Sequence, residues 1–128
     1  MTVGSPVRVL IVDDEASLLQ LMQRFVSHLG YEVDTSSSGE DAWREFSSDP
    51  LRYKLVIADL TMPDMPGEEL LRKMLSVHPA LRILVCSGYP INRENYAALS
   101  PEQIGFLQKP FVPAMLLEAI ERLMSVLS

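Results

Sequence analysis

The residues of this sequence that are suited to a reactive site are polar side chains at the ends of short apolar runs: Asp13, Asp14, Asp59, Ser87 and Lys109. Short apolar runs bounded by turn-forming residues predict buried strands. In an open sheet of parallel strands, the carboxyl ends of the strands gather along one edge, where α/β proteins place their ligand sites. The sequence therefore predicts that these scattered residues form one polar site.

Three of these residues, Asp13, Asp14 and Asp59, carry carboxylates. Carboxylates gathered at a partly desolvated edge repel one another, and such a cluster persists only with a cation or with raised pKa values. Mg²⁺ is the cation that the pattern favours, because it prefers hard oxygen ligands and is typically held by one or two carboxylates together with substrate phosphate. Taken alone, residues 13–15 have a simpler interpretation, which is the capping of a helix N-terminus.

Lys109 and Ser87 could complete such a site. At an edge that faces three carboxylates, the Lys109 ammonium could pair with Asp59 or with a phosphoryl oxygen, and the Ser87 hydroxyl could donate to the same oxygens. The turn after Asp59, which two prolines and a glycine shape, can leave the carbonyl of Thr61 pointing back toward a metal. The simpler interpretations are a solvated surface lysine and a turn-forming serine.

Composition and charge narrow the function classes. The chain of 128 residues has the size of a single domain, expected to span 1–128 with a core of about 7–127. A net charge of −6 without a Lys/Arg run argues against direct nucleic-acid binding. No apolar stretch is long enough to span a membrane. One cysteine, Cys86, lies in an apolar run and is expected to be buried, which suits a reducing cytoplasm. His28 and His78 are expected on solvated helix faces, which leaves no zinc site.

Strands and helices alternate along the chain. Strands are predicted at residues 7–12, 31–35, 54–58, 82–86 and 104–107. Helices are predicted at residues 18–29, 38–49, 67–77 and 92–99, and from Pro113 onward. The helical period places Leu21 inward in the first helix, and Leu117 and Leu127 inward in the last. Five such β/α units predict an α/β fold with a doubly wound parallel sheet in the strand order 2-1-3-4-5.

The whole constellation resembles the receiver domains of two-component response regulators. The pieces that carry the resemblance are Asp13-Asp14, the stretch from Asp59 to Gly67 (DLTMPDMPG), Ser87-Gly88 and Lys109-Pro110. They occur in the order and spacing of the family and span almost the whole chain. The resemblance implies a flavodoxin-like (β/α)5 fold.

The resemblance also implies a role for each position. Asp59 is then the phosphoacceptor, and Lys109 and Ser87 each take a phosphoryl oxygen. Asp14, Asp59 and the Thr61 carbonyl then hold Mg²⁺ directly, while Asp13 acts through water. Phe106 occupies the family's aromatic switch position, although a packed strand residue is the simpler interpretation. The Lys109-Pro110 bond is often cis in this family.

A receiver domain of this kind is a cytoplasmic signalling module that assists its own phosphorylation and dephosphorylation and is not otherwise an enzyme. Its implied partner is a sensor histidine kinase or a histidine phosphotransfer domain, and the implied output surface is formed by residues 92–99, strand 104–107 and the last helix. The segments around Ser87 and Lys109 also resemble receivers fused to hybrid kinases. Gly88, where alanine is frequent, should be harmless, whereas the bulky Tyr89 could screen the phosphoryl group.

Two rival interpretations conflict with single features of the sequence. A haloacid-dehalogenase-type phosphatase needs a second aspartate two positions after its nucleophile, where this chain has Thr61. A flavodoxin-like FMN protein needs a phosphate loop where residues 13–15 would repel phosphate. The alternative that stays open is a pseudo-receiver, an unphosphorylated interaction module on the same fold.

Overall fold

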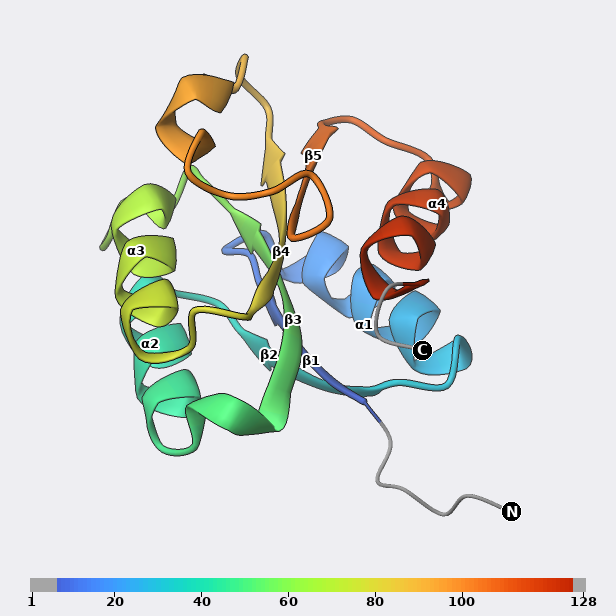
Figure 1. Cartoon of the computed structure of the whole chain (residues 1–128). Helices are drawn as coiled ribbons and strands as arrows, with labels where there is room; N and C mark the ends of the chain where they lie inside the picture. Colours follow the sequence, from blue (N-terminus) through green and yellow to red (C-terminus); the bar gives the residue numbers. More distant parts are fainter. Residues whose placement is uncertain (1–6, 126–128) are drawn as a thin grey trace.

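The computed structural model describes residues 7–125, which form a twisted parallel sheet of five strands between two layers of helices (Figure 1). The strands are β1 (Arg8–Val12), β2 (Glu32–Ser36), β3 (Tyr53–Asp59), β4 (Arg82–Ser87) and β5 (Ile104–Gln108). Their order is β2-β1-β3-β4-β5, and every pairing is parallel. The predicted strand order is therefore confirmed.

The register of the strands brings the polar residues to one edge. Val12 of β1 pairs with Ala58 of β3, which places Asp13 level with Asp59. Ser87 ends β4 and pairs with Gln108 of β5, so Lys109 is the next residue beyond that pair. The carboxyl ends of four apolar strands thus fix the relative heights of the candidate site residues.

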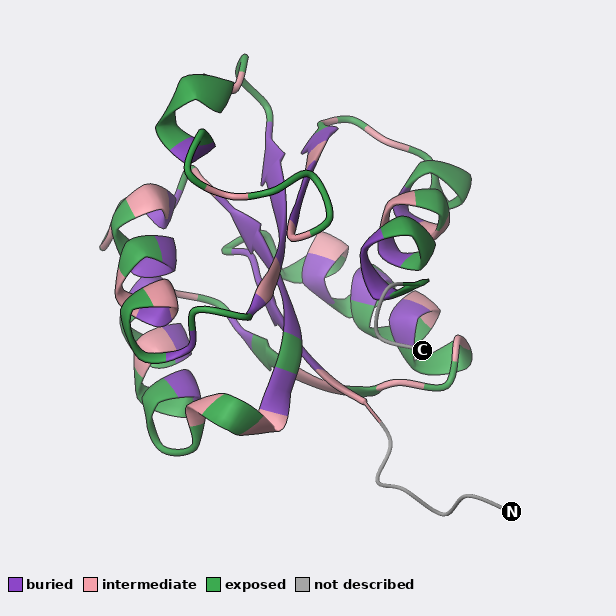
Figure 2. Ribbon diagram, viewed as in Figure 1, coloured by how far each residue is buried: buried purple, intermediate pink, exposed green. Residues whose placement is uncertain are grey.

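The α-helices among residues 7–125 are α1 (Ala16–His28), α2 (Gly39–Ser47), α3 (Gly67–Val77) and α4 (Pro113–Met124). Helices α1 and α4 cover one face of the sheet, and α2 and α3 cover the other (Figure 1). Each face has its own apolar cluster, and Figure 2 shows buried residues along the strands and on the helix sides that face them. No helix in the described part of the chain is long and apolar enough to cross a membrane.

The segment 92–99, predicted as an α-helix, forms only a short 3₁₀ helix, η2 (Arg93–Tyr96). The side chain of Asn92 starts it by accepting a hydrogen bond from the N–H of Glu94. Tyr96 is the one buried residue of η2. Because short helices depend on packing of an apolar stripe, this segment has too little to bury for a longer helix. The helix at Pro113 is consequently the fourth α-helix and not the fifth.

Other side-chain predictions have mixed outcomes. Leu21 is exposed, so its predicted inward position is wrong: Leu19, Met22 and Val26 form the buried stripe of α1. His28 is exposed and Cys86 is buried, both as predicted, and burial raises the pKa of the Cys86 thiol to about 12. Leu117 is half-buried, and Leu127 lies outside the described residues.

His78 does not lie on a solvated helix face. Its side chain is buried, stacks on Phe46 at 6.4 Å between ring centroids, and lies with Nε2 2.9 Å from the carbonyl oxygen of Tyr53. His78 follows Val77, the last residue of α3, where the chain turns back toward the sheet. Because His78 lies beyond the helix end, the helical period does not determine the direction of its side chain. The imidazole is therefore a part of the core.

Candidate functional site

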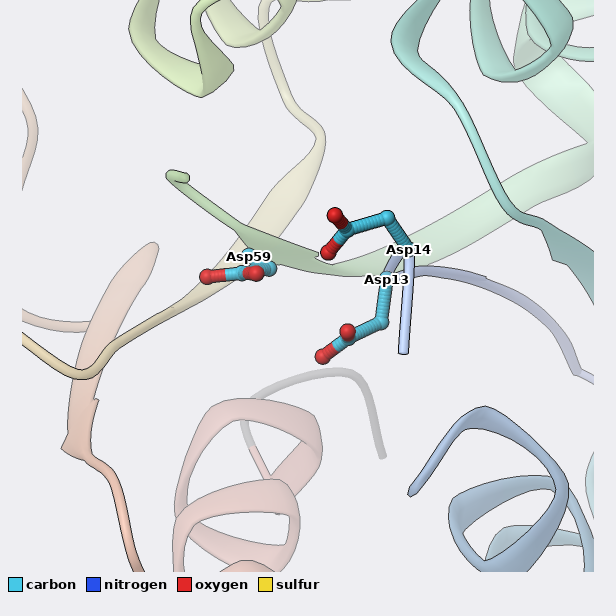
Figure 3. A group of neighbouring side chains, drawn as sticks. All are labelled: Asp13, Asp14 and Asp59. Carbon is cyan, nitrogen blue, oxygen red and sulfur yellow. The ribbon is translucent and has the colours of Figure 1, made fainter. Parts of the chain in front are cut away.

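Three carboxylates meet at the carboxyl edge of β1 and β3. One oxygen of each of Asp13, Asp14 and Asp59 lies within 4.8 Å of the others. Figure 3 shows the three side chains reaching from the two strand ends toward the same space. Asp13 and Asp59 are only 1% and 4% exposed, whereas Asp14 is exposed. The predicted acidic cluster therefore exists, with two desolvated members and one solvated member.

Lys109 supplies positive charge to this cluster. Its Nζ lies 2.8 Å from Oδ2 of Asp13 and 3.4 Å from Oδ2 of Asp59. The prediction named Asp59 as the protein partner, but the shorter contact is to Asp13. Burial lowers the pKa of Lys109, yet its hydrogen bond and attraction to Asp13, and then to Asp59, outweigh this effect and raise the pKa. The ammonium is thus fixed as a cation.

The backbone on either side of Lys109 holds this residue beside the acidic cluster. The N–H of Lys109 donates to the carbonyl oxygen of Ser87 at 2.7 Å, which ties the end of β5 to the end of β4. The following Lys109-Pro110 peptide bond is cis, as the resemblance implies.

Asp59 is held in a poorly solvated place. Burial is the largest influence and raises the pKa of its carboxyl, and the charge of Asp13 raises it further. The N–H of Thr61 and the Lys109 ammonium act in the opposite direction without cancelling the effect on the pKa. The pKa of Asp59 therefore lies above its ordinary value of 3.8, and a further cation beside the carboxyl would lower it.

Two side chains show contacts that the sequence did not predict. The N–H and the hydroxyl of Thr61 both lie 3.3 Å from Oδ1 of Asp59, so Thr61 also orients the carboxylate, beyond the predicted use of its carbonyl. Oδ1 of Asp13 accepts the N–H of Glu15 at 2.9 Å. Asp13 therefore closes the turn before α1 and also takes part in the acidic cluster. The N-cap residue of α1 is Glu15, which has no side-chain capping hydrogen bond, so the capping interpretation of residues 13–15 is wrong.

Ser87 is buried at the same edge. Its Oγ accepts the N–H of Tyr89 at 3.0 Å, and this bond uses an acceptor lone pair and leaves the hydroxyl hydrogen free to donate. The side chain of Tyr89 is 67% exposed. A Cβ added at Gly88 would meet no atom within 4 Å, so the alanine that is frequent in the family would fit there.

Phe106 lies half-buried on β5, opposite Val85 of β4. Its ring meets the edge of Tyr96 at 5.6 Å, and the guanidinium carbon of Arg93 lies 4.6 Å from its centroid. Beside it is a groove of about 520 Å³, lined by Arg93, Tyr96, Ala97, Leu99, Pro101, Ile104, Phe106 and Arg122. The proposed switch residue thus forms part of a surface that η2, β5 and α4 share.

The donor set fits Mg²⁺. Three carboxylates provide hard oxygen ligands, and Lys109 offsets only one of their three charges. Asp13 already binds Lys109 and the N–H of Glu15, whereas Asp14 is exposed and has its oxygens toward the cluster (Figure 3). A divalent cation that prefers oxygen ligands would offset the repulsion among the three carboxylates that Lys109 does not neutralise.

Sequence reasoning missed Asp64. Its carboxylate accepts hydrogen bonds from the N–H groups of Gly39 and Glu40, which are 25 and 24 residues away. A single sequence contains no pattern that predicts a contact over such a separation. The only available indication was an aspartate within a proline-containing turn.

Comparison with known proteins identifies the family of this chain. The sequence model of the response regulator receiver domain matches residues 9–121. Chemotaxis protein CheY of Thermotoga maritima is 30% identical over 116 residues, which are 90% of this chain and 95% of that protein. Response regulator MprA of Mycolicibacterium vanbaalenii is 33% identical over 93% of this chain but only 51% of its own length. The chain thus spans nearly all of some relatives and about half of others.

Solved structures agree with the sequence matches. The structure of a CheX–CheY–BeF3–Mg²⁺ complex from Borrelia burgdorferi has a TM-score of 0.82 at 26% identity, covering 98% of this chain and 92% of that chain. Response regulator TrrA of Thermotoga maritima, solved in complex with Mg²⁺ and BeF, has a TM-score of 0.78 at 29% identity, covering 91% and 98%.

Proposed function

The chain belongs to the response regulator receiver domain family, and on that premise we propose that it is the phosphoacceptor module of a two-component phosphorelay, with Asp59 as the acceptor. The observation that carries the proposal is the position of Asp59, a buried carboxylate at the end of β3 that faces Asp13 and Asp14 and lies 3.4 Å from the Lys109 ammonium. A nucleophile for phosphoryl transfer needs such positive charge beside it, because it must approach an anion.

The donor is the phosphohistidine of a sensor histidine kinase or of a histidine phosphotransfer domain. A carboxylate oxygen of Asp59 attacks the phosphorus, the new O–P bond forms and the N–P bond breaks. The leaving imidazole keeps the electron pair of that bond and takes up a proton, so the products are an acyl phosphate and a neutral histidine. Lys109 and Ser87 each take a phosphoryl oxygen, which places an ammonium and a hydroxyl donor at the developing charge.

Asp14, Asp59 and the carbonyl of Thr61 would hold Mg²⁺ directly, and Asp13 would act through water. The exposure of Asp14 and the engagement of Asp13 by Lys109 and Glu15 support this division of roles. When bound, the ion supplies charge neutralisation to the carboxylates and to the phosphoryl oxygens. Thr61 contributes through its own N–H and hydroxyl, which keep Oδ1 of Asp59 in place and leave Oδ2 beside Lys109.

The signal then passes from Ser87 to Phe106. When the Ser87 hydroxyl donates to the phosphoryl group, its loop moves toward Asp59, and Phe106 turns inward from the surface of η2, β5 and α4. Three observations support a switch at this place: the hydrogen bond that Ser87 Oγ accepts from the N–H of Tyr89, the half-buried ring of Phe106, and the groove beside it. Because that bond uses only an acceptor lone pair, the Ser87 hydroxyl can still donate. The ring now packs against Tyr96 and Arg93, so its movement would change that groove directly.

The proposed module is a single domain over residues 1–128 that works in the cytoplasm. It acts as a signalling protein that promotes its own phosphorylation and dephosphorylation, and not as an enzyme for a separate substrate. Its partners are proteins, with no direct contact to nucleic acid or membrane, which the net charge of −6 supports. Two arrangements fit the sequence, a free-standing regulator and a receiver fused to its kinase.

The test is phosphorylation by acetyl phosphate, followed by intact-mass spectrometry. We expect the wild type to gain one phosphoryl group when Mg²⁺ is present, and Asp59→Asn to gain none. The matched control is Asp49→Asn, which changes one exposed carboxylate outside the site and should react as the wild type does. Equal modification of wild type and Asp59→Asn, or full modification in excess chelator, would contradict the proposal. A wild type that takes no phosphate and still binds a partner protein would identify a pseudo-receiver.

A further inference from the structure

The loop that follows the phosphoacceptor is anchored to a helix distant in sequence. Oδ1 of Asp64 accepts the N–H of Gly39 at 3.0 Å, and Oδ2 accepts the N–H of Glu40 at 2.9 Å. These are the first two residues of α2, which otherwise has no role in the proposed site. The carboxylate of Asp64 thus binds the N-terminus of α2 with both oxygens.

The anchor contributes to the hydrogen bonding of the helix start. An α-helix begins with four N–H groups that lack a partner within the helix. In α2, Oγ of Ser38 accepts one of them, the N–H of Asp41, at 3.1 Å, and the carbonyl of Ser38 accepts the N–H of Ala42 at 3.0 Å as the first bond of the helix itself. Asp64 accepts the N–H groups of Gly39 and Glu40, so the cap of this helix is shared between its own N-cap residue and the loop.

Close packing between Gly39 and Met65 also holds the loop against the start of α2. A Cβ at Gly39 would lie 2.7 Å from Cβ of Met65, so glycine is needed for this approach. At the base of the loop, the N–H of Gly67 donates to the carbonyl of Leu60 at 3.1 Å. A Cβ at Gly67 would lie 2.8 Å from the carbonyl oxygen of Asp59. The loop is therefore fixed at its base beside the acceptor and at its far end on α2.

Thr61 lies between these two fixed points. Its N–H and hydroxyl reach Oδ1 of Asp59, and its position along the loop depends on where the loop ends are held. We propose that Asp64 is a positioning residue for the phosphoacceptor site: by binding the N-terminus of α2, it holds the loop 60–66 so that Thr61 orients the carboxylate of Asp59. The expected effect on phosphorylation rests on the proposed function. The expected effect of Asp64 on the positions of Thr61 and Asp59 does not depend on that function.

The charge of Asp64 suits this role. The N–H groups of Glu40 and of Gly39 lower the pKa of its carboxyl, which keeps it ionised and accepting with both oxygens. A negative charge at a helix N-terminus also interacts favourably with the helix dipole. The rival interpretation is that Asp64 merely caps α2 and stabilises the fold, without effect on the orientation of Asp59.

A pair of variants separates the two interpretations. Asp64→Ala removes both the cap and the anchor of the loop. Ser38→Ala, the matched control, removes a cap of the same helix and leaves the loop contacts to Gly39 and Glu40 in place. Asp64→Asn keeps one carbonyl oxygen that can accept one of the two N–H groups. Unfolding curves are recorded first, so that every variant is assayed under conditions where it is folded.

Three measurements are then compared: Mg²⁺ affinity by calorimetric titration, the rate of phosphorylation by acetyl phosphate at saturating Mg²⁺, and hydrogen exchange of the Thr61 amide by NMR. For Asp64→Ala we expect about tenfold losses in affinity and in rate, as for other residues that orient the ligands of a metal, and faster exchange at Thr61. Asp64→Asn should recover part of each loss. Ser38→Ala should match the wild type in all three.

Equal metal affinity, rate and Thr61 exchange in Asp64→Ala and Ser38→Ala would overturn the inference and leave the proposed function standing. Failure of the wild type to accept phosphate at Asp59 would overturn the proposed function instead. In that case the Thr61 exchange and the Mg²⁺ titration still decide whether Asp64 positions the loop.

Discussion

Replacing Asp59 by asparagine should stabilise the protein in the absence of metal. The substitution removes one charge from the cluster and keeps the size of the side chain. The asparagine amide would still offer a carbonyl oxygen to the N–H and hydroxyl of Thr61, which now lie 3.3 Å from Oδ1 of Asp59. Lys109 would keep its 2.8 Å contact with Asp13. The variant therefore tests the charge of Asp59 with few other losses.

The magnitude follows from the distances in the site. With an effective dielectric constant of about 20, the repulsion between Asp13 and Asp59 at their 4.8 Å limit is roughly 3.5 kcal/mol, and the attraction of Lys109 at 3.4 Å is roughly 5 kcal/mol. The exposed Asp14 adds a weaker, solvent-screened repulsion. The attraction exceeds this least repulsion by about 1.5 kcal/mol, and the repulsion of Asp14 reduces that difference, so the desolvation of the buried carboxylate decides the sign. We expect Asp59→Asn to raise the free energy of unfolding by roughly 1–2 kcal/mol.

The assay is urea and thermal unfolding at pH 7 in a chelator, with and without added Mg²⁺. Such a gain raises the melting temperature by roughly 3–6 °C for each kcal/mol in a domain of this length. Mg²⁺ should then stabilise the wild type more than the variant, because a ligand that binds the folded state more tightly stabilises it more. Asp49→Asn serves as the control and should stay within about 0.5 kcal/mol of the wild type.

The gain should also depend on pH in a definite direction. The pKa of Asp59 is raised in the folded state from the ordinary value of 3.8, mainly by burial. The folded state therefore binds the proton more tightly, and stability from the protonated carboxyl is present below 3.8 and lost as pH rises through the folded pKa. The advantage of Asp59→Asn should shrink on acidification. A variant less stable than the wild type at pH 7 in chelator would show that the Lys109 attraction dominates, and would refute this reasoning.

Three further predictions concern single side chains. Asp14→Ala should weaken Mg²⁺ binding at least about tenfold in calorimetric titration, and unchanged affinity would remove Asp14 from the ligand set. Ser87→Ala should still accept phosphate at Asp59 but lose the amide chemical-shift response of residues 91–107 to a beryllofluoride phosphate mimic; a response like that of the wild type would contradict the switch. Tyr53→Phe should lower the free energy of unfolding by roughly 1.5–3 kcal/mol in urea titration, because the buried hydroxyl donates to the Asp34 carboxylate at 2.6 Å, and a loss below about 0.5 kcal/mol would contradict that value.

The acidic cluster could be predicted from sequence because it depends on backbone register alone. Once strands of one direction are placed side by side, the residue after each strand reaches the same edge. Asp13 and Asp59 are brought level by the pairing of Val12 with Ala58, which side-chain detail cannot change. The choice of Asp13 as the closer partner of Lys109 could not be predicted, because the 2.8 and 3.4 Å contacts to the two carboxylates differ by a fraction of an ångström.

Two of the wrong predictions share another cause. Local patterns predict a solvated helix face for His78 and a helix for the segment 92–99, and tertiary contacts decide both. His78 is drawn into the core by the carbonyl of Tyr53, 25 residues away in the sequence, and by the ring of Phe46. The segment 92–99 contains residues that tolerate a helix, but Tyr96 is the one residue of η2 that finds a place in the core. Helical propensity is a weak preference that packing overrides.

The charge of the site connects its structure to its proposed chemistry. Three carboxylates and one ammonium leave two negative charges at the edge where an anionic phosphoryl group must arrive. The protein alone therefore repels its proposed substrate, and a divalent cation brings the sum of these charges to zero. An excess of carboxylates would be a defect in a purely structural edge, since it costs stability. In a phosphoacceptor site it makes the reaction depend on Mg²⁺, because the cation must offset the repulsion between the carboxylates and the arriving phosphoryl group.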